Sequence, residues 1–241
     1  MRLITLVLLV LTFPALAAEK NPDPWEGFNR SMFHFNEKMD DYLLRPTAVA
    51  YNKVVPSPAR TALSNVFSNA GEVKTIINDV AQLKLLQAGA DTVRFILNTT
   101  LGFFGVFDVA TPIGLQKHNE DFGQTFGYWG VPSGPYLMLP LLGPSTVRDS
   151  AGLGVEYAAD ISYADLGRNG TEDLAIAVVY GVSMRAQLLN IEGMVSGDRY
   201  VFIRSFYLQH RDFLINDGNS ADDFGDDDWE DFDDEIDEDL E

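Results

Sequence analysis

The sequence predicts an all-α fold, and three observations support it. Apolar residues recur three or four positions apart through most of residues 23–216. Capping residues stand directly before prolines at Asp23-Pro24 and Ser57-Pro58, a pairing typical of helix starts. No long alternation of apolar and polar residues predicts a strand. The 241 residues are sufficient for a single large helical domain.

The first predicted helix begins at Asp23, where Pro24 and Glu26 complete a capping-box arrangement. It is expected to end at Arg45-Pro46. Its apolar residues are unusually aromatic, and we interpret them as a stripe that faces the core rather than lipid. They are Trp25, Phe28, Met32, Phe35, Met39 and Leu43.

Three further helices are predicted before residue 101. The first begins at Ser57 and ends at Gly71, which is placed as a C-cap. A separate helix carries the apolar residues of 73–83, and the next covers 85–100. Arg94 lies beside the apolar face of this last helix, so it is expected to snorkel or to pair with a carboxylate.

The remaining helices lie after residue 144. Ser145 or Thr146 can cap a helix that runs to about residue 159, a second helix covers 171–190, and Asp198 caps a last one that ends near Asn216. Residues 101–109 form an apolar, glycine-broken segment with three phenylalanines. It could fill a core or lie among acyl chains at a bilayer interface, and the sequence leaves both open.

Residues 121–149 are rich in glycine and proline and yet apolar and aromatic. Irregular backbone of this kind must be buried in protein or must line a cavity, because its N–H and C=O groups need partners. The stretch is therefore a candidate for the wall of a passage.

The two ends of the chain differ from this body. Residues 1–17 read as a signal peptide, with Arg2, an apolar segment and an Ala15-Leu16-Ala17 cleavage site before Ala18. The helical domain is expected to cover 18–216. The tail, 217–241, carries 15 acidic and no basic residues, so of the net charge of −19 only −4 belongs to the rest. We expect a disordered tail, with an amphipathic helix on a protein partner as the alternative.

Several kinds of chemistry have no support in the sequence. It contains no cysteine and no lipase motif G-x-S-x-G. The near-neutral body also lacks the excess of positive charge that is typical of nucleic-acid binding. His118 near Glu120 and Asp121 is interpreted as a polar turn with a surface histidine. We therefore predict no catalytic residues, no metal site, no cofactor and no enzymatic activity.

A family resemblance is carried by many short matches in one order. They include Asp23-Pro24, Glu26 to Arg30, Arg45-Pro46, Arg94-Phe95, Phe107 to Ala110, Gly134-Pro135-Tyr136, Arg148-Asp149 and Arg185 to Leu189. Over residues 21–216 the chain resembles the MlaA (VacJ) family of outer-membrane lipoproteins. The chain departs from the family in two features, its acidic tail and Ala18, which stands where the family has its lipidated cysteine.

The resemblance implies a doughnut-shaped helical domain that lies in the inner leaflet of the outer membrane. It implies a role in phospholipid transport that removes phospholipid from the outer leaflet and maintains lipid asymmetry. The implied partners are phospholipid, a periplasmic lipid-carrier protein of the Mla pathway and a trimeric porin. A soluble periplasmic lipid-binding protein is the alternative, because the cysteine is missing.

The same resemblance places the passage beside a lipid channel. The expected wall residues of the lipid path are Tyr136, Leu137, Leu139, Leu141 and Leu142. Gly134 and Gly143 are candidates for a hinge, although each precedes a proline and could equally form a rigid turn.

Overall fold

The computed structural model describes residues 21–159, 161, 170–189 and 197–218. Within these ranges the fold is helical apart from one antiparallel hairpin, which confirms the predicted fold class. The elements in chain order are α2 (Glu26–Met39), a π-helical turn (Asp40–Leu44), α3 (Arg45–Val54), α4 (Ser57–Ala81), α5 (Leu85–Thr100), a 3-10 turn (Thr111–Ile113), α6 (Phe122–Tyr128), β1 (Tyr136–Leu139), β2 (Gly143–Thr146), α7 (Val147–Ala158), α8 (Gly170–Leu188) and α9 (Arg199–Ile215). The predicted signal peptide, the end of the predicted 171–190 helix and most of the acidic tail lie outside the described residues.

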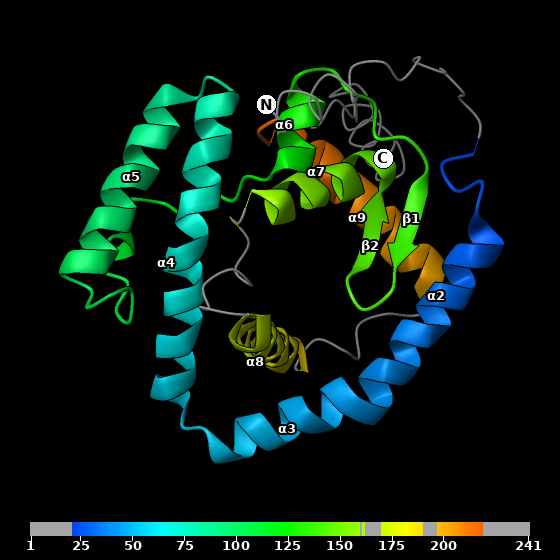
Figure 1. Cartoon of the computed structure of the whole chain (residues 1–241), viewed down its shortest axis with the longest axis horizontal. Coiled ribbons are helices and arrows are strands. Elements are labelled where there is room, and N and C mark those ends of the chain that lie inside the picture. The colour runs from blue at the N-terminus through cyan, green and yellow to red at the C-terminus, as the bar shows by residue number, and fades with distance from the viewer. Residues whose placement is uncertain (1–20, 160, 162–169, 190–196, 219–241) are drawn as a thin grey trace, which may run out of the picture.

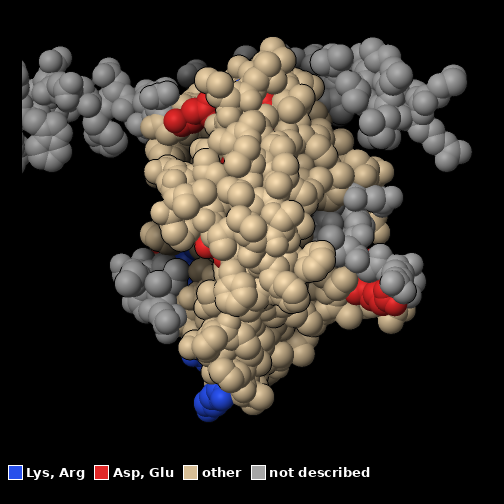
Figure 2. Space-filling view, turned by 90° about the vertical axis from the view of Figure 1, so that its left-hand side faces the viewer, with Lys and Arg blue, Asp and Glu red and all other residues tan. Residues whose placement is uncertain are grey.

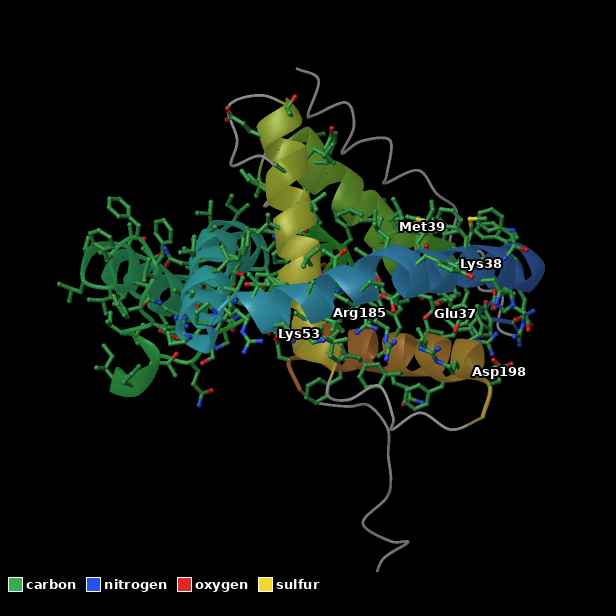
Figure 3. All side chains as sticks on the ribbon, turned by 90° about the horizontal axis from the view of Figure 1, so that it is seen from below. Glu37, Lys38, Met39, Lys53, Arg185 and Asp198 are labelled. Carbon is green, nitrogen blue, oxygen red and sulfur yellow. The ribbon has the colours of Figure 1, made fainter. Side chains whose placement is uncertain are left out.

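The elements are arranged as a ring (Figure 1). Helices α2, α3 and α4 form three sides, and α6, α7, α9 and the hairpin close the fourth. Helix α5 packs on the outer side of α4. Helix α8 is seen end-on in Figure 1 and crosses the α2–α3 ribbon in Figure 3, so it runs across the plane of the ring.

Two predicted boundaries in the first helix were wrong. The helix does not end at Arg45-Pro46, because α2 continues through the π-helical turn directly into α3. Pro46 lies just after this π-helical turn and has no backbone N–H, so the continuous helix lacks one backbone hydrogen bond there. At the other end Asp23 is not the cap: Trp25 holds that position, and the Asp23 side chain is buried.

Helix α4 also corrects the prediction, because it is one helix of 25 residues rather than two. Gly71 lies buried inside it and is not a C-cap. Its buried face continues on both sides of Gly71 through Phe67, Glu72, Thr75 and Asn78. This face packs against α5 and α6, so tertiary contacts hold the helix together where local sequence predicts a break.

The interior of the described fold is polar to an unusual degree. Of its buried residues 21 are polar or charged and 11 are apolar, and four of the 11 are alanines. Large apolar side chains instead point outward, and 34 of them are exposed. The first helix shows this directly: Trp25, Phe28, Phe35 and Leu43 are exposed, so the core-facing interpretation of this stripe was wrong for these four residues. Phe33 and Asn29 face inward in their place. Met32 does pack against the core, and Met39 is half-buried.

Other predictions agree with the structure. Thr146 caps α7 by accepting a hydrogen bond from the Asp149 amide, and Asp198 caps α9 through the amides of Tyr200 and Val201. Arg94 pairs with a carboxylate, as expected, at 2.9 Å from Glu72. No helix within the described ranges combines the length and the apolar character needed to cross a bilayer.

Candidate functional site

The glycine-rich stretch predicted as irregular backbone folds into α6 and the β1–β2 hairpin. Strand pairing places Tyr136 opposite Thr146 and Leu139 opposite Gly143. Because side chains alternate along a strand, β1 divides its residues between two faces. Tyr136 and Met138 are buried in a cluster with Phe33 and Tyr200, whereas the Leu137 side lies outside this cluster.

The structure places the five expected wall residues in three settings. Tyr136 has no exposed surface, so its side chain packs the hairpin onto α2 and α9. Leu137 and Leu139 are half-buried on the opposite face of β1. Leu141 and Leu142 form the exposed turn, with 63% and 67% of their surface accessible. This turn points toward the middle of the ring of ribbons (Figure 1).

Two asparagines of α2 hold the hairpin. Asn29 donates from Nδ2 to the Tyr136 carbonyl over 3.0 Å and accepts from the Met138 amide over 2.8 Å. Seven residues later, on the same face of the helix, Asn36 does the same with the Leu139 carbonyl (2.8 Å) and the Leu141 amide (2.7 Å). Each side-chain amide thus replaces a neighbouring strand at the edge of β1.

Asp23 anchors this assembly from the chain start. Its carboxylate accepts hydrogen bonds from the Tyr200 hydroxyl, from Asn29 Nδ2 at 2.7 Å and from Arg204 at 2.9 Å. Burial acts to raise the pKa of Asp23, but these three donors outweigh it and hold the pKa below its usual value. The segment before α2 is therefore joined to α9 as well as to the hairpin.

A second network joins α9 to α6 and α7. Arg211 forms a bidentate pair with Asp121 at 2.6 and 2.9 Å, and contacts Asp149 at 3.0 Å. Burial opposes ionisation of Asp121, yet the Arg211 pair lowers its pKa to about 2. Tyr207 donates to the other oxygen of Asp149 at 2.8 Å. These contacts fix the helices at both ends of the hairpin.

The two hinge candidates both have backbone that favours glycine. Gly134 has φ +66° and Gly143 has φ +87°, in the left-handed region. A Cβ atom at Gly134 would lie 3.3 Å from the Val147 side chain, whereas one at Gly143 would meet nothing within 4 Å. Gly143 therefore lies in an open turn, where only the backbone angle restricts substitution.

The apolar segment after α5 lies on the surface. Phe103 and Phe104 are 68% and 73% exposed, and Phe107 and Leu101 are exposed beside them. Figure 2 shows that the face carrying α5 has almost no charged side chains. Underneath, Arg94 holds the segment by donating to Asp108 at 3.0 Å and to the Leu115 carbonyl at 2.6 Å.

Sequence reasoning missed a buried carboxyl cluster between α4 and α5. Asp79 and Asp91 are fully buried, and both oxygens of Asp91 lie 3.0 Å from His118 Nδ1. Burial, and then the neighbouring Asp91, raise the pKa of Asp79 to about 7. His118 thus pairs with a buried carboxylate, while its side chain is 37% exposed, in agreement with the surface histidine that we expected. Helical spacing alone carried no signal for the pairing with Asp91.

Comparisons with known proteins agree with this geometry. Residues 21–214 match the family model described as MlaA lipoprotein. The "Intermembrane phospholipid transport system lipoprotein MlaA" of Escherichia coli (strain K12) is 39% identical over 204 residues, which are 81% of this chain and 79% of the relative. The protein of the same name from Haemophilus influenzae is 32% identical over 206 residues, with 83% and 82% covered.

A solved structure extends the likeness to the fold. It is described as "Structural basis for maintenance of bacterial outer membrane lipid asymmetry", and it superimposes with a TM-score of 0.71 at 39% identity. The match covers 80% of this chain and 99% of the other. The chain therefore belongs to the MlaA lipoprotein family.

Proposed function

We propose that this protein is the outer-membrane component of a phospholipid transport system and maintains lipid asymmetry. It removes mislocalised phospholipid from the outer leaflet and passes it to a periplasmic carrier without covalent chemistry. The names of its relatives support the transport role, and the related structure's description supports lipid asymmetry.

The observation that carries this proposal is the inverted distribution of side chains. A protein surrounded by water buries its large apolar residues, whereas this chain exposes them and buries polar networks. Exposed apolar area of this extent is stable only against an apolar medium or partner. We infer that the outer surface of the ring, including the α5 face, lies among acyl chains of the inner leaflet, with a trimeric porin as a further neighbour.

The lipid path remains part of the proposal. Leu137 and Leu139 on the free face of β1, and Leu141 and Leu142 at its turn, supply the apolar wall. Tyr136 supports that wall from behind, since its own side chain is fully buried. The polar edge formed by Asn36 and the hairpin carbonyls lies beside these leucines. The headgroup of a lipid can therefore contact polar groups while its tails contact the leucines.

Fractionation tests the membrane setting. The mature protein, after cleavage before Ala18, is expected to stay with the outer membrane in high salt and after osmotic shock. The printed sequence contains no cysteine, so we infer that apolar area holds it. Release by either treatment would instead support the soluble lipid-binding alternative.

A genetic test addresses transport. The full chain, expressed in Escherichia coli that lacks its own relative, is expected to restore a low level of outer-leaflet phospholipid. The readout is palmitoylation of lipid A together with detergent sensitivity. Normal outer-membrane insertion without any change in these readouts would contradict the proposed function.

A further inference from the structure

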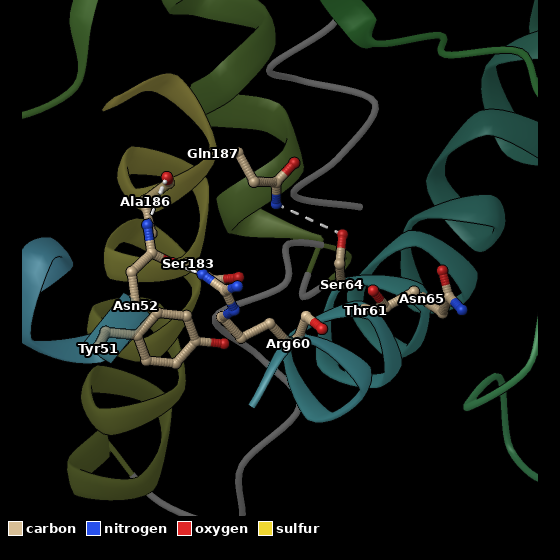
Figure 4. Close-up of a pocket in the computed structure, with 10 residues that line it drawn as sticks. Tyr51, Asn52, Arg60, Thr61, Ser64, Asn65, Ser183, Ala186 and Gln187 are labelled. Carbon is tan, nitrogen blue, oxygen red and sulfur yellow. Dashed lines mark hydrogen bonds between the residues drawn. The ribbon is translucent and has the colours of Figure 1, made fainter. Parts of the chain in front are cut away.

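A polar cavity of about 320 Å³ lies at the corner of the ring where α3 meets α4 and α8 passes beside them (Figures 1 and 4). Its lining comes from all three helices and includes Tyr51, Asn52, Arg60, Ser64 and Gln187. None of the lining residues is acidic. The volume stands at the small end of the roughly 300–1,000 Å³ of typical ligand pockets, so it suits a compact polar group.

Arg60 is the only charged residue of this lining. Its Nη1 donates to Asn52 Oδ1, and its Nε is buried with no acceptor among the described residues. By contrast Arg94 and Arg211 each hold two carboxylates. A half-buried guanidinium that lacks a counter-anion is costly, and an anion bound in the cavity would remove that cost.

Tyr51 provides a second unused donor. Its hydroxyl is buried and has no hydrogen-bond partner in the described part of the chain. Figure 4 shows the hydroxyl beside the Arg60 side chain, between α3 and α4. A buried hydroxyl is ordinarily paired. The Tyr136 hydroxyl is also unpaired but lies in the core cluster, whereas Tyr51 lines a cavity that can admit an acceptor.

Asn52 fixes the guanidinium in place. Its Nδ2 donates to the Ala186 carbonyl of α8 over 3.1 Å, and this turns its Oδ1 toward Arg60. Across the cavity Gln187 and Ser64 form a contact of 3.4 Å between α8 and α4 (Figure 4). The two donors are therefore presented by a framework of three helices, which is the geometry of a built site.

We propose that this cavity binds the phosphate of a phospholipid headgroup, with Arg60 and Tyr51 as donors to its two free oxygens. Guanidinium groups suit phosphate because they donate in a planar fork. Exposed apolar residues adjoin the lining, with Val54 one turn after Tyr51 and Leu188 next to Gln187, where acyl chains could lie. The choice of a lipid over free phosphate rests on the proposed function.

The test measures phospholipid bound to the full chain in detergent by native mass spectrometry. The probes are phosphatidylglycerol, diacylglycerol, which lacks the phosphate, and inorganic phosphate. Tyr51→Phe and Arg60→Gln are each expected to weaken phosphatidylglycerol binding by about tenfold, the size of one lost charge-assisted hydrogen bond. Binding of diacylglycerol should not change, and Tyr42→Phe, at an 84% exposed tyrosine, is the matched control.

Tyr51→Phe separates ligand binding from folding. It removes a hydroxyl that has no partner in the described protein, so the melting temperature should stay the same or rise. Equal phosphatidylglycerol binding by wild type and both variants would overturn the site but leave the proposed function standing. A wild type that binds no phospholipid would instead contradict the proposed function. Binding of inorganic phosphate alone, sensitive to Tyr51→Phe, would assign the cavity to free phosphate and overturn the headgroup proposal.

Discussion

At the residue scale, amide and carboxylate side chains hold the most buried points of this fold. Asn29 satisfies the backbone of β1 in both directions and also donates to Asp23, so one side chain joins three segments. Such a network is stable only if each member is paired, because an unpaired buried polar group costs about 1–3 kcal/mol. The paired network around Asn29 and Asp23 therefore specifies how these three segments meet.

Asp79 makes stability depend on pH. Its pKa is raised from 3.8 to about 7 in the folded state, so between these values the folded protein holds a proton that the unfolded chain has lost. The contribution of protonated Asp79 to the free energy of unfolding is complete below pH 4. It is lost as pH rises toward 7, at up to about 1.4 kcal/mol per pH unit. Asp79→Asn imitates the protonated form, so it should stabilise the protein at pH 8.

The measurement is the melting temperature in detergent between pH 4 and 8. Asp79→Asn should lose less stability over this range than wild type, and the difference between the two curves should grow up to about pH 7. Asp91, Glu120 and His118 face the same cluster and interact with Asp79, so the difference between the two curves reports the titration of this coupled group. Asp41→Asn, at an exposed carboxylate, is the control. Parallel curves for wild type and Asp79→Asn would contradict this account.

At the scale of elements, close packing of backbones decides how α6 and α7 meet. Gly152 lies on α7 where an added Cβ would come within 2.4 Å of the Gly123 amide nitrogen of α6. Only a glycine allows this approach, which in turn brings Asp149 to Arg211.

Gly152→Ala should therefore destabilise the protein, by about 1–3 kcal/mol or more, because the obstacle is backbone rather than a movable side chain. Gly154→Ala is a matched control on the same helix, since its Cβ would meet nothing within 4 Å. Replacing glycine by alanine at an open helical position should be neutral or stabilising by up to about 1 kcal/mol. Thermal unfolding of both variants measures the contrast, and equal loss in both would show that α6 and α7 are not in close contact.

The hairpin turn gives a second prediction at this scale. Gly143→Val places a β-branched residue at φ +87°, which costs roughly 1–2 kcal/mol without any clash. We expect the turn to shift and outer-leaflet phospholipid to rise, while the fold is retained. The readouts are lipid A palmitoylation and melting temperature.

Gly114→Val controls for backbone strain alone. Gly114 has φ +92° and open space around it, and it lies outside the hairpin. Unchanged lipid asymmetry in Gly143→Val, or the same change in both variants, would count against a gating role for this turn.

At the scale of the whole molecule, the ring presents apolar side chains outward and joins its helices by polar contacts. The α5 face carries few charged side chains (Figure 2), and Leu101, Phe103, Phe104 and Phe107 are exposed in the segment that follows α5. At about 25 cal/mol per Å², even a few hundred Å² of such surface outweigh the contribution of a single acyl anchor.

Charge on this surface should weaken membrane attachment. The double variant Phe103→Glu with Phe104→Glu is expected to increase the fraction released by high salt, because two carboxylates would enter the acyl region. The matched control, Phe103→Leu with Phe104→Leu, keeps the surface apolar and should behave like wild type. If the charged variant stays as firmly bound, another face of the ring holds the membrane.

The tail yields a separate prediction. Truncation after Asn216 removes the acidic residues 217–241, which an anionic membrane surface repels. Membrane association should therefore remain intact in fractionation. Release of the truncated protein would identify the tail as an anchor.

The sequence by itself determined the helical class, most helix starts and the family, and it left two possibilities for Arg94, of which the structure shows the ion pair. These depend on local periodicity, capping chemistry and motif order, which act within a few residues. Tertiary structure alone decided which face of α2 is buried, the unbroken course of α4 and the hairpin in place of irregular backbone. Helical spacing cannot show which side of a stripe meets lipid, and the partners of β1 are asparagines more than 100 residues away along the chain. In a water-soluble protein the apolar face of an amphipathic helix points toward the core. Here many apolar faces point outward and the interior is polar, so only the assembled ring shows which way each face points.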